Sequence, residues 1–192
     1  MKKIVASDLK NLHEYELIRD DWRKDVIATK ARRRVLVGPT MSLVFENRLT
    51  VLNQIQEMCR AERLVKPDAV QAEIDVYNEL LPGPGEVAAT LFIEITEQPR
   101  IQEILDGFIG LDEPGHLALT VGGRRFPALF APGQSREDRI SAVHYIRFPL
   151  GEEGSRALSA GEEAALDVAH GDYRARQVLS KETVEELVRD LG

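Results

Sequence analysis

Apolar residues recur every three or four positions between Ser7 and about Lys30, and this spacing is typical of one face of an amphipathic helix. The apolar positions are Leu12, Tyr15, Ile18, Trp22 and Val26. A serine or aspartate before the first of them can cap the helix, because its side chain accepts a hydrogen bond from an unpaired backbone N–H. The pattern therefore predicts a helix that begins after Ser7 or Asp8.

A second pattern, β-branched and aromatic residues around turn residues, predicts β-hairpins. Residues 35–37 and 43–45 flank Gly38-Pro39-Thr40, and residues 117–121 and 124–129 are separated by Gly122-Gly123. Paired glycines suit the positive φ angles of a two-residue hairpin turn. Further strands are expected at 87–95, at 142–148 and within 164–178, around the turn His170-Gly171-Asp172.

The helices that remain are grouped between these strands. They are expected at 46–64, at 67–81, after Thr96 and from Ser180 to Gly192. Pro67 suits the first position of the helix at 67–81. Pro82-Gly83-Pro84-Gly85 ends this helix, because each proline removes a backbone donor. Hairpins with grouped helices favour an α+β fold, in which a largely antiparallel sheet packs against several helices.

A length of 192 residues suits one domain, and neither side of the proline–glycine break has a separate composition. Residues 1–192 are therefore expected to form a single domain. Apolar residues make up 43% of the chain and charged residues 30%, which is enough apolar surface for a real core.

The long helix at 46–64 carries two sets of charged residues. On a helical wheel its buried stripe consists of Val51, Leu52, Ile55, Met58 and Cys59. Arg48 and Glu62 fall within that stripe, so they either lie at the rim of the core or find partners inside it, because an unpaired buried charge is costly. They are candidates for a buried polar site.

The opposite face of this helix is polar and is expected to be solvated. Glu57 and Arg60 are three residues apart and can pair on the surface. With Glu46 and Gln56 they are candidate contacts for a protein partner.

The strand at 142–148 adds two further candidates for the buried polar site. Alternation places His144 on one face, and Arg147 on the other with Tyr145. One face or the other therefore buries a polar group. A lone histidine on an apolar strand face is commonly a hydrogen-bonded core residue, and if His144 is chemically active, Glu62 is the expected carboxylate partner.

Composition excludes several classes of function. The net charge of −7 disfavours nonspecific binding to nucleic acid or anionic membrane. Residues 30–34 form a basic cluster, which is the local exception to this acidic character. The apolar runs are far shorter than a membrane helix needs, and Ser7-Asp8 interrupts any signal peptide, so a cytoplasmic protein is expected.

Motifs for metals and cofactors are missing from the sequence. Cys59 is the single cysteine, which rules out an intrachain disulfide or a thiolate metal cluster. The chain has no phosphate-binding glycine loop, no dinucleotide fingerprint, and no Glu-x-x-His pair for a di-iron site. We therefore expect no metal and no cofactor.

The run from Phe45 through Met58, followed by Arg60 and Glu62-Arg63, resembles the signature of a bacterial family catalogued as domain of unknown function 3501. Residues 141–148 and the turn that ends in Tyr173 resemble it too, so the similarity covers nearly the whole chain. The family has no assigned activity. Its genes are often found beside those for rubrerythrin-like proteins and a cysteine-rich iron–sulfur oxidoreductase, which implies an accessory role in redox or peroxide metabolism.

Two hypotheses follow. The first is a non-enzymatic accessory protein that binds a redox partner, rubrerythrin-like or an iron–sulfur oxidoreductase, through the charges near Glu57 and Arg60. The alternative is an enzyme or a metal- or ligand-binding protein, whose polar site is formed by the 46–64 helix and the 142–148 strand.

Overall fold

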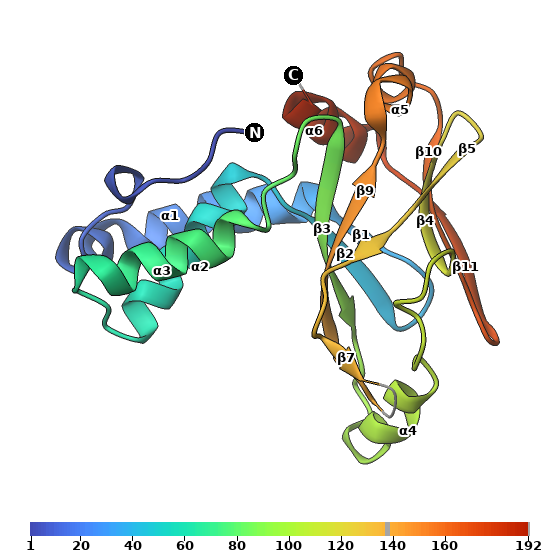
Figure 1. The fold of residues 1–192 in the computed structure, drawn as a ribbon, viewed down its shortest axis with the longest axis horizontal. Coiled ribbons are helices and arrows are strands. Elements are labelled where there is room, and N and C mark those ends of the chain that lie inside the picture. The colour runs from blue at the N-terminus through green and yellow to red at the C-terminus, as the bar shows by residue number, and fades with distance from the viewer. Residues whose placement is uncertain (137–138, 192) are drawn as a thin grey trace.

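The computed structural model describes residues 1–136 and 139–191, and it shows an arm of helices beside a pair of β-sheets (Figure 1). Every strand pairing described is antiparallel, and the helices are grouped rather than alternating with the strands. The α+β fold class is confirmed.

The helical arm and the helices around the sheets have the following bounds. The arm contains α1 (Leu12–Arg33), α2 (Arg48–Ala61), α3 (Pro67–Asn78) and the 3-10 turn η1 (Ala6–Asp8). The helices that adjoin the sheets are α4 (Ile101–Asp106) after the 3-10 turn η2 (Gln98–Arg100), α5 (Gly151–Ser159) and α6 (Lys181–Leu191). Figure 1 shows α5 and α6 at one end of the sheets and α4 at the other.

The first sheet has the strand order β1 (Arg34–Leu36), β2 (Met41–Phe45), β3 (Glu86–Ile93), β9 (Val143–Pro149) and β6 (Leu129–Phe130). The second has the order β11 (Tyr173–Val178), β10 (Ala164–His170), β4 (Leu117–Val121) and β5 (Arg124–Pro127). A short ribbon joins β7 (Ser135–Arg136) to β8 (Arg139–Ile140). The hairpins predicted at β1–β2, β4–β5 and β10–β11 are confirmed.

The main core lies between the two sheets. Leu91 and Ile146 from the first sheet and Leu119 and Leu166 from the second are buried in one apolar cluster. Because successive strand residues point to opposite faces, the neighbours of Leu91 and Ile146 lie on the outer face of the first sheet. That outer face turns toward the helical arm, and it is where the candidate site lies.

The arm has an apolar cluster of its own, in which Val51 and Ile55 of α2 pack with Ile74 of α3 and Ile4. Asn78 fixes the N-terminal segment to α3, since its side chain accepts from the N–H of Ile4 and donates to the carbonyl of Ile4, both at 2.9 Å. The arm is thus held by its own small core.

Several predicted helix boundaries were wrong. The first helix is capped by Asn11, whose side chain accepts from the N–H of Glu14, and not by Ser7 or Asp8. Thr96 caps no helix, because α4 begins only at Ile101. The helix α5 was not predicted.

The helix expected at 46–64 is shorter, at Arg48–Ala61. The side chain of Asn47 accepts from the N–H of Thr50, and the hydroxyl of Thr50 accepts from the N–H of Asn47, which starts the helix there. Glu46 therefore lies between the end of β2 and the start of α2, and its N–H donates to the carbonyl of Ala88 at 2.8 Å. Along the residues described, no helix has the length and apolar character to cross a membrane.

Candidate functional site

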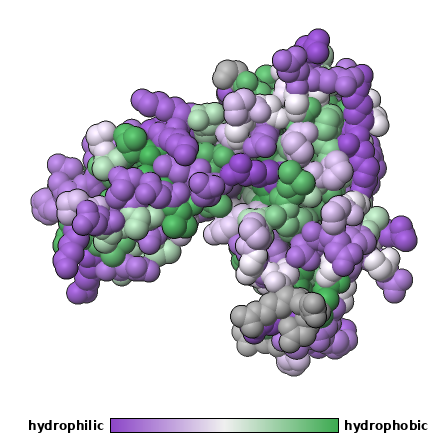
Figure 2. Space-filling model, viewed as in Figure 1, coloured by the Kyte–Doolittle hydropathy of each residue, from purple (hydrophilic) through white to green (hydrophobic). Residues whose placement is uncertain are grey.

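A cavity of about 600 Å³ opens on the outer face of the first sheet, beneath the end of α3. Its lining comes from five stretches of the chain: the residue that follows β2, the end of α3 with the residues after it, the middle of β3, β6 with the residues after it, and β9. Figure 2 shows hydrophobic surface on both sides of the notch between the helical arm and the sheets. The lining includes Glu46, Val76, Glu79, Ala88, Leu129, Tyr145 and Arg147.

Glu46 supplies a buried carboxylate to this cavity, with 3% of its surface exposed. One carboxylate oxygen accepts from the hydroxyl of Thr90 at 2.6 Å and from the amide of Gln54 at 3.5 Å. The other accepts from the hydroxyl of Thr50. These three donors are all neutral, and they hold the carboxylate in place without cancelling its charge.

Tyr145, on the outer face of the first sheet, lines the cavity together with Glu46. Its strand β9 pairs with β3 so that Tyr145 is opposite Thr90, and Thr90 is the residue that donates to Glu46. Burial raises the pKa of the Tyr145 phenol, and the negative charge of Glu46 raises it further. The phenol therefore stays protonated near neutral pH and is available to donate a hydrogen bond into the cavity.

Arg147 closes one side of the cavity by joining β9 to the helical arm. Its guanidinium donates to the backbone carbonyl of Glu79, just after α3, and lies 3.4 Å from the carboxylate of Glu86. Glu86 in turn accepts from the N–H of Gly83 at 3.0 Å, which fixes the proline–glycine connection. Arg147 thus sets the spacing between α3 and the sheet.

Apolar side chains form the rim of the cavity. Val76 on α3 is 64% exposed and Leu129 on β6 is 54% exposed, and both residues line the cavity. Exposed apolar residues gathered around a concave site are typical of ligand-binding surfaces. The cavity therefore has an apolar mouth, with Glu46 and Tyr145 as polar groups inside.

The four residues proposed for a buried polar site do not form one cluster of contacts. Arg48 pairs with Asp8, and Glu62 is exposed at the C-terminal end of α2, about 20 Å further along the helix at 1.5 Å per residue. His144 is fully buried on the inner face of the sheet, where Nε2 lies 2.8 Å from the carbonyl of Ser141. Among these four residues, Arg147 is the one that lines the cavity.

The four candidate partner contacts are also dispersed. Glu46 is buried in the cavity, and Gln56 is buried and exchanges two hydrogen bonds of 2.9 Å with the backbone of Lys10. Glu57 accepts from Arg19 at 2.8 and 2.9 Å and from the hydroxyl of Tyr15 at 2.6 Å. Arg60 pairs with Glu16 at 2.6 Å.

These contacts of Glu57 and Arg60 join α2 to α1. The Arg19 guanidinium lowers the pKa of Glu57 to about 2, against the opposing effect of burial. Glu57 therefore remains charged and paired across the physiological range. Both residues have internal partners in the free protein, and a docking partner would have to compete with them.

Thr90 and Tyr145 are among the site residues that sequence reasoning did not single out. A signal was present for Tyr145, because strand alternation places it on the same face as Arg147. No local pattern shows that Glu46 meets this face. In the residues described, no group of three or more His, Cys, Asp or Glu side chains is arranged to hold a metal ion.

Comparison with known proteins supplies a family and a structural relative. A family model described as "Protein of unknown function (DUF3501)" matches residues 3–191. A crystal structure of a novel protein of unknown function from Burkholderia pseudomallei is 29% identical, with a TM-score of 0.92 and 100% of both chains covered. No curated protein matches the chain. The shared fold thus comes without an assigned activity.

Proposed function

The chain belongs to the family described as "Protein of unknown function (DUF3501)", and within that family we propose that it binds a small organic molecule in the cavity between α3 and the first sheet. The observation that carries this proposal is the cavity itself, about 600 Å³ in volume, with Glu46 and Tyr145 inside an apolar mouth. Small-molecule sites typically enclose about 300–1,000 Å³ and combine apolar walls with a few fixed polar groups.

The polar groups are held in place before any ligand arrives. Thr50 and Thr90 orient the Glu46 carboxylate, and antiparallel pairing sets Tyr145 opposite Thr90. Preorganised groups favour binding because the ligand does not have to supply the free energy of ordering them. This arrangement supports recognition of a ligand by one acceptor, Glu46, and one donor, Tyr145.

A blocking substitution tests the proposal. Ala88 lines the cavity and is 4% exposed, so Ala88→Phe places a ring in the space that a ligand would occupy. Leu36→Phe is the matched control, since Leu36 is 61% exposed on β1 at the far edge of the same sheet. We expect compounds that give ligand-observed NMR signals with the wild type and the control to lose them with Ala88→Phe. Equal binding to all three proteins, with unfolding midpoints unchanged, would rule out this cavity.

A role in binding a redox protein is a second proposal, supported by the exposed apolar side chains of α1. Leu17 is 74% exposed and Ile27 is 60% exposed, on the helix that also holds Glu57 and Arg60 of α2 through Arg19 and Glu16. Scattered exposed apolar residues are common, but two on one charged helix suit a partner surface. Co-expression with a rubrerythrin-like protein or an iron–sulfur oxidoreductase should give co-purification that Leu17→Glu with Ile27→Glu abolishes. Failure to recover either protein would contradict this role.

A further inference from the structure

We infer that the molecule bound in the cavity is an organic cation, an amine or guanidine attached to an apolar body. This inference rests on the proposed ligand-binding function and adds the charge of the ligand. Its basis is that Glu46 is a buried carboxylate that faces a cavity and, among the side chains described in residues 1–97, 99–135 and 139–191, forms no ion pair.

Among the side chains described, no cation pairs with Glu46, which is unusual for a carboxylate that is 3% exposed. Carboxylates removed from water are normally paired with an arginine, lysine or metal ion, because the loss of hydration is otherwise costly. Glu46 has hydroxyl and amide donors from Thr50, Thr90 and Gln54, which leave its formal charge uncompensated. A cationic group entering the cavity would supply the missing partner.

Arg147 does not fill this role, although it lines the same cavity. Its guanidinium is directed to Glu86 at 3.4 Å and to the carbonyl of Glu79. The side chain of Glu79, which also lines the cavity, is exposed and forms no ion pair among the residues described. The lining therefore carries two carboxylates that lack a cation and one guanidinium that has its own carboxylate. The excess of negative charge favours a positive ligand.

The remaining walls suit the rest of such a molecule. Tyr145 places an aromatic ring beside Glu46, and a cation within about 6 Å of an aromatic face is attracted to it. Val76 and Leu129 provide apolar surface at the mouth. An ammonium group would donate to Glu46 while its hydrocarbon portion packs against the rim, which excludes water from the charged pair and strengthens it.

Three aromatic probes that share an apolar body and differ in charge test this inference at pH 7: phenethylamine, phenethyl alcohol and hydrocinnamate. We expect the amine to bind the wild type at least about tenfold more tightly than the alcohol or the acid, because a charge-assisted hydrogen bond adds to the same apolar contact. Titration calorimetry or NMR shift titration measures the three dissociation constants.

Variants at one position separate charge from shape. Glu46→Gln should reduce amine affinity about tenfold or more and leave alcohol affinity within about twofold, while Glu46→Asp, which keeps the charge, should retain the preference for the amine. Glu163→Gln is the matched control, since Glu163 pairs with Arg176 on the exposed side of the second sheet.

The outcomes separate the two proposals. Equal or tighter binding of the alcohol or acid, still blocked by Ala88→Phe, overturns the cationic ligand and leaves the cavity as a binding site. Amine binding that Glu46→Gln does not weaken also overturns it. If none of the three probes binds the wild type, both proposals fail.

Discussion

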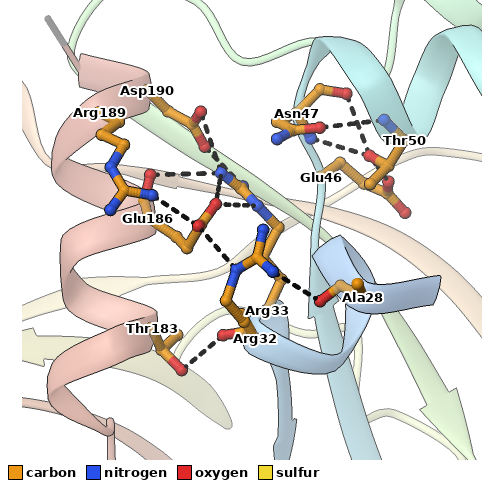
Figure 3. A network of polar contacts seen from close by, with 10 residues as sticks. All are labelled: Ala28, Arg32, Arg33, Glu46, Asn47, Thr50, Thr183, Glu186, Arg189 and Asp190. Atoms are coloured by element: carbon orange, nitrogen blue, oxygen red, sulfur yellow. Dashed lines mark hydrogen bonds and ion pairs between the residues drawn. The ribbon is translucent and has the colours of Figure 1, made fainter. Parts of the chain in front are cut away.

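Glu186 and Glu46 are both buried carboxylates, 5% and 3% exposed, and they lie in neighbouring parts of the molecule (Figure 3). Glu186 of α6 is surrounded by cations: Arg32 at 3.0 Å, Arg33 at 2.9 Å and Arg189 at 2.6 Å. Glu46 has neutral donors, from threonine and glutamine side chains. The two residues are about equally buried, but the donors around Glu186 are cationic and those around Glu46 are neutral.

The difference distinguishes a structural carboxylate from a candidate binding group. Arg33, which is 1% exposed, joins the end of α1 to Glu186 and Asp190 on α6 and so connects the helical arm to the sheets (Figure 3). Burial opposes ionisation of Glu186, but hydrogen bonds from Arg32 and Arg33 outweigh it and lower the pKa. All the charges in that cluster are used within the fold, whereas the charge of Glu46 is directed toward a cavity.

The largest expected effect comes from breaking the structural cluster at Arg33. Arg33→Met keeps an unbranched apolar stem but leaves Asp190 without its partner at 2.6 Å and removes one cation from Glu186. Removing one member of a buried ion pair costs about 3–5 kcal/mol, because the remaining charge stays buried and unpaired. Urea unfolding should show this loss, and Arg23→Met, at an exposed position of the same helix, should not. A loss below about 1 kcal/mol would show that the cluster does not hold the arm.

A smaller loss is expected from Glu186→Gln, because Arg33 keeps its contact with Asp190. We expect the free energy of unfolding to fall by about 2 kcal/mol, since charge-assisted hydrogen bonds are replaced by one to an amide. The folded-state pKa of Glu186 is lowered, so its contribution is complete above the ordinary value near 4.5 and is lost as pH falls through the folded-state pKa. The free energy of unfolding, measured at several pH values between neutral and acid, should therefore fall less steeply toward acid pH in the variant than in the wild type. The same pH dependence in both proteins would contradict a stabilising role for the ionised Glu186.

Much of this fold could be predicted from the sequence because its signals are local. The turn at Gly122-Gly123 has φ angles of 56° and 78°, and only glycine adopts such angles without strain, so the β4–β5 hairpin is specified by two adjacent residues. The same holds for Pro67, which occupies the first turn of α3. Local chemistry fixes these features whatever packs around them.

The candidate site could not be predicted in this way because its walls meet only in the folded chain. Helical periodicity placed Glu46 on the polar face of the long helix, but the Asn47–Thr50 cap starts the helix two residues later and leaves Glu46 just past the end of β2. The pattern Asn-x-x-Thr was present as a signal for that boundary. Contacts such as Thr90 with Glu46, 44 residues apart, have no counterpart in any local pattern.

His144 is a buried base that, like Glu46, forms no ion pair with the side chains that the structure describes. Burial lowers its pKa, against smaller opposing effects from the Ser141 carbonyl and Asp112, and its Nδ1 has no partner among the residues described. The unfolded chain therefore binds a proton more readily, so stability falls as pH drops below the ordinary value near 6.5. Between pH 7 and 5 the free energy of unfolding of the wild type should fall by about 1 kcal/mol more than that of His144→Gln, as measured by urea unfolding at each pH. His13→Gln, at an exposed position, is the control, and equal losses in all three proteins would contradict the prediction.

The smallest expected effect on stability is that of Glu46→Gln. It tests whether the fold needs the charge of Glu46 as it needs the charge of Glu186. The amide keeps the shape of the carboxylate, and the hydroxyls of Thr50 and Thr90 can rotate to donate to its oxygen or accept from its nitrogen. The substitution removes an uncompensated buried charge and breaks no ion pair among the residues described, so the free energy of unfolding should change by less than about 1 kcal/mol or rise slightly. Urea unfolding of the Gln variants at positions 46 and 186, at the same pH, measures the contrast. A loss at Glu46 as large as that at Glu186 would mean that the fold itself requires the Glu46 charge, because a carboxylate kept for a ligand should not be needed by the unliganded protein.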